Sequence, residues 1–133
     1  MTKVGSYKRW NRTKTEETIL ASGLECKIVG TGDLVVSQYP EAGSVILKEK
    51  GQIILYVGNA TPETVSVPNL IGKNAETANT MLHALGLNIS ISGPMNGEVW
   101  TQSIAPGTVV PRGTAVEISF RSMDGDDEPN YLG

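Results

Sequence analysis

The chain has 133 residues, of which 39% are hydrophobic and 5% aromatic, and its formal net charge is −3. A core made mainly of aliphatic side chains in so short a chain is small. The 15 glycines and 7 prolines indicate many turns, which favours short strands over a helical bundle. The negative charge argues against nucleic acid as the main partner, because a phosphate-binding module usually has a basic excess. No apolar run approaches the ~20 residues of a membrane-spanning helix, so we expect no membrane span in these residues.

The first predicted helix precedes Gly23. Thr13 and Glu16 fit a capping box at its start, in which the two side chains satisfy free backbone N–H groups of the first turn. Gly23 ends the helix, because a residue without a Cβ adopts the left-handed conformation at little cost. The strand after it alternates polar and apolar residues. The residues expected on its buried face are Leu24, Cys26 and Ile28.

The last strand of this first unit is apolar on both faces. One face contains Ile54 and Tyr56, and the other contains Ile53, Leu55 and Val57. Because neighbouring side chains of a strand point to opposite sides, this pattern leaves the register ambiguous. It also predicts that another part of the protein covers the second face.

The second unit begins with a clearer helix. Asn74 is its predicted N-cap and Gly86 its predicted end. The apolar residues between them recur at helical spacing: Ala75, Ala78, Met81, Leu82 and Leu85. Strands follow at Leu87, Ile89 and Ile91, then near Val99, and finally at Val116, Ile118 and Phe120. The order of elements is helix, strand, strand, strand.

The two units repeat each other along the chain. Three ordered matches support this interpretation: residues 23–28 with 86–91, residues 37–45 with 101–109, and Gly51 with Gly113. The offset between matched residues stays between about 62 and 67, which is hard to reach by chance. We therefore interpret the chain as a duplication of one small motif, and we call its halves the first and the second repeat.

The duplicated motif resembles the PASTA family, small repeats found in penicillin-binding proteins and membrane Ser/Thr kinases. In the second repeat the resemblance depends on residues 67–72, Ala78, Leu82, Gly86, Leu87, Gln102, Pro106, Gly107, Val109, Pro111, Gly113 and Val116. In the first repeat it extends from about Ile19 through Gln38, Pro40, Gly43 and Gly51. Each motif is common by itself, but their occurrence together, twice and in the same order, is specific for this family.

The first repeat departs from the family pattern at several positions. It opens with only Val4-Gly5 where the second repeat has Val67-Pro68, so we expect it to begin within the motif. Thr15 stands where the second repeat has Ala78, and the turn at residues 48–50 is enlarged. The second repeat departs at Ile104, where the family usually has proline.

The resemblance implies an α+β fold of two tandem small repeats, each with one helix packed on a three-stranded antiparallel sheet. We expect the first repeat at residues 1–60, a linker at 61–66, the second repeat at 67–122 and an acidic tail at 123–133. The resemblance also implies a non-catalytic, extracytoplasmic module of a bacterial cell-wall protein. Its expected roles are to bind or sense peptidoglycan fragments or β-lactams and to help localise the parent protein.

Two repeats followed by a short acidic tail resemble the C-terminal region of a penicillin-binding transpeptidase, including the sporulation-type enzymes. A catalytic transpeptidase domain would then lie upstream in the same polypeptide and outside these residues. Two alternatives stay open at this point. One is the sensor ectodomain of a membrane Ser/Thr kinase, and the other is a structural spacer or protein-docking segment without a ligand.

Groups suited to catalysis are scarce in this sequence. His83 is the only histidine, and a dyad with the single cysteine, Cys26, is formally open. We favour a core position for Cys26 and a polar helix flank for His83. The acidic residues Asp124, Asp126, Asp127 and Glu128 lack the spacing of a calcium-binding loop. We therefore expect no catalytic residue, no metal ion and no cofactor.

A muropeptide presents sugar rings, amides and carboxylates, so its binding surface needs aromatic faces, amide groups and a cation. The candidates near the irregular segments are Gln38, Tyr39, Trp100, Gln102 and Arg112. A structural role remains open for each residue type: the glutamines can bond the backbone of the following turn, the aromatic rings can cover the small cores, and the arginine can be a solvated charge. Trp10 with Arg9 and Arg12 forms a second candidate surface.

Overall fold

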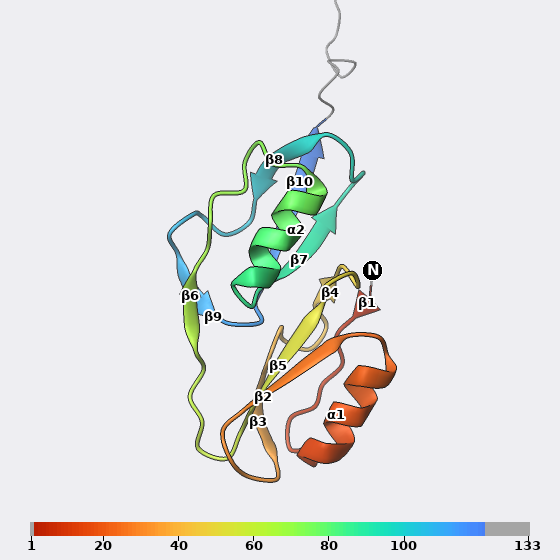
Figure 1. Cartoon of the computed structure of the whole chain (residues 1–133), viewed down its shortest axis with the longest axis vertical. Coiled ribbons are helices and arrows are strands. Elements are labelled where there is room, and N and C mark those ends of the chain that lie inside the picture. The colour runs from red at the N-terminus through yellow and green to blue at the C-terminus, as the bar shows by residue number, and fades with distance from the viewer. Residues whose placement is uncertain (1, 122–133) are drawn as a thin grey trace, which may run out of the picture.

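A computed structural model describes residues 2–121, which form two small units (Figure 1). The elements of the first unit are β1 (Thr2–Lys3), α1 (Arg12–Ala21), β2 (Glu25–Val29), β3 (Val35–Tyr39), β4 (Val45–Ile46) and β5 (Gln52–Val57). Those of the second are β6 (Thr64–Ser66), α2 (Ala75–Ala84), β7 (Asn88–Ser92), β8 (Glu98–Gln102), β9 (Val109–Pro111) and β10 (Ala115–Arg121). The two units have the same order of one helix and three main strands, which confirms the duplication. Strand β6 includes residues that the sequence assigns to the linker.

Each unit contains a three-stranded sheet with its last strand in the middle. The strand orders are β2-β5-β3 and β7-β10-β8, and the short pairs β1-β4 and β6-β9 accompany them. The predicted α+β plan of one helix on three strands is confirmed. One pairing differs from the expected antiparallel sheet: β5 and β10 run antiparallel to β3 and β8 but parallel to β2 and β7. The last strand enters between two strands of opposite direction, so it must be parallel to one of them.

The first helix begins before the predicted capping box. Asn11 is its N-cap, and Asn11 Oδ1 accepts hydrogen bonds from the backbone N–H groups of Thr13 and Lys14 at 2.9 and 3.2 Å. The predicted Thr13–Glu16 capping box is therefore wrong, because asparagine caps a helix as well as threonine does and here it comes first in the chain. The predicted end is confirmed, since Gly23 follows the helix with a φ of 89°.

The second helix begins and ends as the sequence predicts. Asn74 Oδ1 accepts a hydrogen bond from the Thr77 backbone N–H at 2.8 Å, and Gly86 adopts a φ of 80° after the last turn. Its buried side includes Ala78 and Leu82, which face the sheet of the second unit. Within residues 2–121, no helix has the length and apolar character needed to cross a membrane.

Each unit has its own hydrophobic core. The first core consists of Val4, Ile19, Leu24, Val35, Ile46, Ile53, Leu55 and Val57. The second consists of Val67, Leu70, Ala78, Leu82, Leu87, Ile89, Val99, Val116 and Ile118. Two separate cores built from matching positions are what a tandem repeat requires. Of the three residues predicted on one buried face, only Leu24, which precedes β2, is buried in the first core. Cys26 and Ile28 on β2 are partly buried at its edge.

The hydrogen bonds at the last turn of each unit correct one match between the repeats. The Glu25 backbone N–H donates to the Gly51 carbonyl, and the equivalent Asn88 N–H donates to the Thr114 carbonyl. Gly51 therefore corresponds to Thr114, and Lys50 corresponds to Gly113. Lys50 and Gly113 share a positive φ, of 62° and 95°. The match of Gly51 with Gly113 was wrong by one residue, because the two glycines meet different needs. A Cβ at Gly51 would collide with the Leu47 carbonyl, and its φ is not positive.

Strand β5 is buried on both of its faces, as its sequence predicts. Ile53, Leu55 and Val57 belong to the first core, while Ile54 and Tyr56 on the opposite face are also fully buried. The covering material includes the segment that joins the repeats, because the Glu63 backbone N–H donates to Tyr56 Oη at 3.1 Å. The register is thereby settled, with the odd-numbered residues turned toward α1.

Candidate functional site

The two candidate glutamines hold their own repeats together. Gln102 Nε2 donates to the carbonyls of Pro68 and Ile104 at 3.1 and 2.8 Å, and Gln102 Oε1 accepts from the Leu70 N–H at 2.9 Å. These bonds tie the opening segment of the second repeat to the irregular segment after β8. The side-chain amide is thus engaged by backbone, which confirms the structural alternative for Gln102.

Gln38 makes the same bonds in the first repeat. Its Nε2 donates to the Gly5 carbonyl at 2.7 Å, and its Oε1 accepts from the Tyr7 N–H at 2.6 Å. Gln38 is 9% exposed. In both glutamines the side-chain amide bonds the backbone of its own repeat, so the amide is fixed in place by the fold.

Tyr39 and Arg112 lie where the two repeats meet. The Tyr39 ring packs edge-on against the Tyr56 ring, with centroids 6.0 Å apart. The backbone of Tyr39 lies so close to Gly113 that a Cβ at Gly113 would collide with it. Arg112 Nε lies 3.8 Å from a Glu63 carboxylate oxygen, and the Arg112 N–H donates to the Glu63 carbonyl at 2.7 Å. Tyr39 therefore lies against the second repeat, whereas Arg112 ties the second repeat to the joining segment. Tyr39 also borders a cleft of about 450 Å³ between the repeats.

Trp100 lies apart from the other candidates, on the open side of the second sheet. It projects from β8 with 52% of its surface exposed. The Arg121 guanidinium lies 3.9 Å from the centroid of the indole ring, and Arg121 also pairs with Glu98 at 3.7 Å. An arginine stacked on an indole holds that ring in one orientation while leaving most of it accessible.

The surface around Trp100 is lined with hydroxyl groups. We call it the outer face, meaning the side of the second sheet turned away from α2, and it consists of Ser90, Ser92, Trp100, Thr101, Glu117, Ser119 and Arg121. The Thr101 and Ser119 hydroxyls are hydrogen-bonded at 2.5 Å, and Ser103 Oγ accepts from the Glu117 N–H at 3.0 Å. A shallow groove of about 310 Å³ runs over this region. The outer face thus combines one exposed indole with donors, acceptors and charges of both signs.

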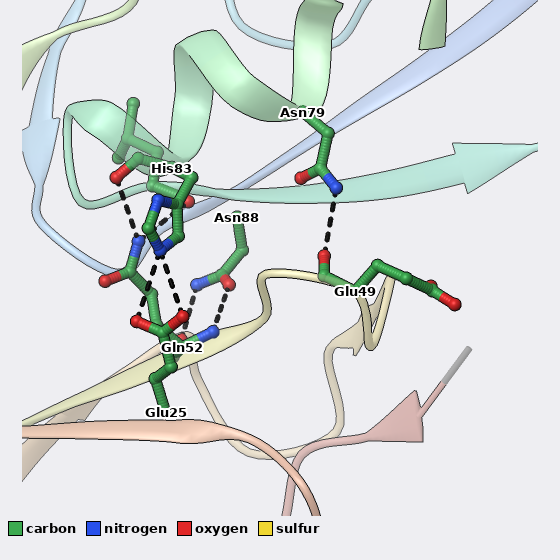
Figure 2. A network of polar contacts seen from close by, with 7 residues as sticks. Glu25, Glu49, Gln52, Asn79, His83 and Asn88 are labelled. Carbon is green, nitrogen blue, oxygen red and sulfur yellow. Dashed lines mark hydrogen bonds and ion pairs between the residues drawn. The ribbon is translucent and has the colours of Figure 1, made fainter. Parts of the chain in front are cut away.

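A polar network between the repeats was not predicted from the sequence. Figure 2 shows its members on α2, at the start of β7 and on the edge of the first repeat. We call this contact zone the seam, defined by Glu25, Glu49, Gln52, Asn79, His83 and Asn88. Asn88 is its most buried member, at 2% exposure. Its side chain accepts from the Gln52 N–H at 2.8 Å and donates to the Gln52 and Gly113 carbonyls at 2.7 and 2.8 Å.

Further seam contacts come from α2 and from β7. Asn79 Nδ2 donates to the Glu49 carbonyl at 2.9 Å, and His83 Nε2 lies 3.1 Å from the Glu25 carboxylate (Figure 2). The Leu47 N–H donates to the Ile89 carbonyl at 2.8 Å. Because alternation along a strand marks Asn88 as solvent-facing, only the placement of the first repeat against it reveals its role.

Comparison with protein families decides the identity of the fold. A family model described as the PASTA domain matches residues 2–59 and again residues 65–122. The chain belongs to the PASTA family. No curated protein matches the chain. PASTA domains are non-catalytic, typically extracellular modules, and they occur in penicillin-binding proteins and Ser/Thr kinases.

Solved structures similar to this PASTA chain come from both kinds of parent. Penicillin Binding Protein 2X from Streptococcus thermophilus is 19% identical, with a TM-score of 0.39, and the match covers 91% of this chain and 17% of that one. The extra-cellular region of the Ser/Thr kinase PrkC from Staphylococcus aureus is 17% identical, with a TM-score of 0.38 and coverage of 88% and 46%. A three-PASTA-domain structure of a Ser/Thr kinase from the same organism is 16% identical, with a TM-score of 0.35 and coverage of 89% and 66%. The chain therefore spans less than two thirds of each of these proteins.

Cys26 and His83 do not form the dyad that the sequence left open. His83 contacts Glu25, and Cys26 lies partly buried on β2. Burial, with a smaller contribution from the Glu16 carboxylate, raises the pKa of the Cys26 thiol to about 11. Such a thiol is protonated and unreactive at neutral pH. Within residues 2–121 no group of acidic, cysteine and histidine side chains is placed to hold a metal ion. The acidic residues at 124–128 lie outside the described residues.

Proposed function

We propose that these PASTA repeats form a non-catalytic, extracytoplasmic module of a bacterial cell-wall protein, a penicillin-binding transpeptidase, and that the module binds peptidoglycan fragments or β-lactams and helps to localise the parent enzyme. The ligand lies on the outer face of the second repeat. The observation that supports this proposal is the exposed Trp100 indole, held by Arg121 beside a row of hydroxyl groups.

The chemistry of the outer face suits a glycan that bears a peptide. An indole offers a flat apolar surface against which the apolar side of a sugar ring can pack. The hydroxyls of Ser92, Thr101 and Ser119 can exchange hydrogen bonds with sugar hydroxyls and amides. The Arg121 guanidinium is a charged, forked donor for a carboxylate. The amides of the two glutamines bond backbone, and Arg112 lies beside the joining segment rather than on the outer face, so the proposal rests on Trp100 and its surroundings.

A titration of the full chain with soluble muropeptides, and separately with a labelled β-lactam, tests the proposal by NMR. The amide signals of β8 and β10 and the indole N–H of Trp100 should shift. Trp100→Ala should weaken binding at least about tenfold, the loss expected for one well-placed aromatic contact. Trp10→Ala tests the second candidate surface: Trp10 is 39% exposed and packs edge-on against Tyr7, with ring centroids 5.3 Å apart, and its loss should leave the affinity unchanged if the ligand lies on the outer face. No shift of any amide at millimolar ligand would refute ligand binding.

The seam favours a second candidate function. A pair of repeats joined by buried hydrogen bonds is stiff enough to serve as a spacer or docking segment that orients a neighbouring catalytic domain, either a transpeptidase or a kinase. Deletion of the repeats from the parent, compared with Trp100→Ala in the parent, separates the two functions. If the deletion abolishes septal or spore placement and Trp100→Ala does not, docking rather than ligand binding is the role of the module.

A further inference from the structure

The exposed indole of the outer face lies at an irregularity in the second sheet. The pairing of β8 with β10 shifts between Ser119 and Phe120, and Trp100 is the residue of β8 that is left without a partner. An extra residue of this kind bends its strand and re-aims the side chain. Beside the shift Glu98 lies directly opposite Arg121, so these two side chains point to the same side of the sheet.

The first repeat has the same shift in pairing but none of the three side chains. Val36 is left without a partner between β3 and β5, so it corresponds to Trp100. A carboxylate, an aromatic ring and a guanidinium therefore occur together at this place in one repeat and are all absent from the other. The corresponding residues are Leu34 for Glu98, Val36 for Trp100 and Gly58 for Arg121.

Arg121 connects the three side chains of the second repeat. Its guanidinium carbon lies 3.9 Å from the centroid of the Trp100 ring, and its Nη2 lies 3.7 Å from Glu98 Oε2. The Arg121 side chain is 47% exposed and the Glu98 side chain 25%. The guanidinium thus holds the indole, while Glu98 offsets the positive charge that a ligand would otherwise meet there.

The charges around Trp100 disfavour an anionic ligand. Glu117 is a second, exposed carboxylate on the same side of β10, so two carboxylates accompany the single guanidinium of Arg121. A ligand carboxylate reaches Arg121 only in competition with Glu98, and it also meets the negative charge of Glu117. A sugar hydroxyl or an acetamido group has no charge, so it meets neither obstacle.

We infer that Glu98, acting through Arg121, determines the ligand preference of the outer face, which favours uncharged glycan over ligands with a carboxylate, β-lactams included. The inference rests on the proposed function, because it assumes that the ligand lies against Trp100. Since the ion pair is partly exposed, the preference is modest, about threefold to fivefold in the dissociation constant.

Two disaccharides that differ by one carboxylate test the role of Glu98. N,N′-diacetylchitobiose is uncharged, whereas the disaccharide of N-acetylglucosamine and N-acetylmuramic acid has a lactyl carboxylate. Each is titrated into the full chain and followed by NMR at the Trp100 indole N–H. The unaltered chain should bind diacetylchitobiose about threefold more tightly. Glu98→Gln should tighten binding of the muramic acid disaccharide and of benzylpenicillin about fivefold, and change binding of diacetylchitobiose less than about twofold.

Two further variants separate competition for Arg121 from negative charge in general. Glu117→Gln also removes a carboxylate from this side of the sheet, but within residues 2–121 the ion pair of Arg121 is with Glu98, so the muramic acid disaccharide should gain less than about twofold. In an Arg121→Gln chain, Glu98→Gln should no longer tighten its binding.

The outcomes distinguish this inference from the proposed function. Equal gains from Glu98→Gln and Glu117→Gln, or the same gain for both disaccharides, would overturn the role of Glu98 and leave the binding face intact. The absence of any shift at Trp100 with all three ligands would refute the binding face itself, and the inference with it.

Discussion

Equivalent sides of the two three-stranded sheets have opposite roles in the two repeats. Ile54 and Tyr56 of β5 occupy the positions of Glu117 and Ser119 of β10. The first pair is fully buried, whereas Glu117 is exposed and Ser119 partly so. In the first repeat this side is an inner wall covered by the joining segment, and in the second it is open surface. The duplication preserved the backbone and allowed one side of the sheet to change from a packing surface into a candidate binding surface.

The seam shows a similar division between equivalent positions. Asn88 opens β7 and is buried, while its counterpart Glu25 opens β2 and is exposed. The junction between the two repeats buries this position in the second repeat and leaves it exposed in the first. A difference in burial between equivalent residues therefore indicates which surface of each repeat contacts the other repeat.

The largest effect on stability is expected when a residue on this side of the first sheet is replaced by its counterpart from the second. Tyr56→Ser places the residue of the second repeat into the first, where it removes a buried ring and the hydrogen bond that Tyr56 Oη accepts from the Glu63 N–H. The unfolding free energy should fall by about 3 to 5 kcal/mol, as for other buried aromatic residues cut back to a small side chain. Urea denaturation followed by circular dichroism measures it.

The reverse exchange is the control for Tyr56→Ser. Ser119→Tyr adds a ring to an exposed side of β10, so the unfolding free energy should change by no more than about 0.5 kcal/mol. Equal effects of Tyr56→Ser and Ser119→Tyr on the unfolding free energy would contradict this difference. They would mean that the side of β5 with Ile54 and Tyr56 does not stabilise the first repeat by packing.

The sequence predicts what depends on local pattern and on burial within one repeat. Gly23 and Gly86 mark both helix ends, and the two apolar faces of β5 predict a covering partner, because these signals come from neighbouring residues. Three features were missed. Asn11 competes with Thr13 as an equally good cap, the parallel pairing of β5 depends on chain topology, and the role of Asn88 depends on the other repeat. A polar residue such as Asn88 follows the ordinary alternation of a strand, so its contact with the other repeat leaves no mark in the sequence pattern.

The candidate site was predicted only in part, for a related reason. Gln38 and Gln102 lie in irregular segments, where an amide can serve a ligand or the backbone, and the structure places both on backbone. Trp100 and Arg112 were singled out by residue type and by their place near irregular segments, yet one is on an open face and the other is in an ion pair with Glu63. Residue type indicates the available chemistry, while exposure decides whether a ligand can reach it.

Asn88→Ala should weaken the contact between the repeats and lower the unfolding free energy by an intermediate amount. The change removes two hydrogen bonds between the repeats and one to the Gly113 carbonyl within the second repeat, and it leaves the buried Gln52 N–H without its acceptor. The unfolding free energy should fall by about 2 kcal/mol, the usual cost of leaving a buried polar group unpaired. The equivalent change in the first repeat, Glu25→Gln, touches only the exposed contact with His83 and should stay within about 0.5 kcal/mol.

Rotational diffusion distinguishes a loosened seam from a damaged second repeat. In the unaltered chain ¹⁵N relaxation should give one correlation time for both repeats. In Asn88→Ala each repeat should tumble partly by itself, with its own amide dispersion preserved. Retention of a single correlation time in this variant would show that Asn88 is not what holds the repeats together.

Lys50 offers the smallest and most local test of the correspondence between the repeats. It adopts a φ of 62° at the position where the second repeat has Gly113. A side chain in the left-handed region is strained, and glycine relieves that strain while adding freedom to the unfolded chain. Because these effects oppose each other, Lys50→Gly should raise the unfolding free energy by only about 0.5 kcal/mol.

The reciprocal change shows why the two positions are nevertheless not interchangeable. Gly113→Ala must place a Cβ against the backbone of Tyr39, which belongs to the other repeat. It should therefore lower the unfolding free energy by more than about 2 kcal/mol, which exceeds the roughly 1 to 2 kcal/mol that a left-handed φ costs by itself. Thermal denaturation of both variants measures the difference. An equally mild effect of Gly113→Ala would mean that the close approach of Gly113 to Tyr39 contributes nothing to the seam, and that the glycine is there only for its φ.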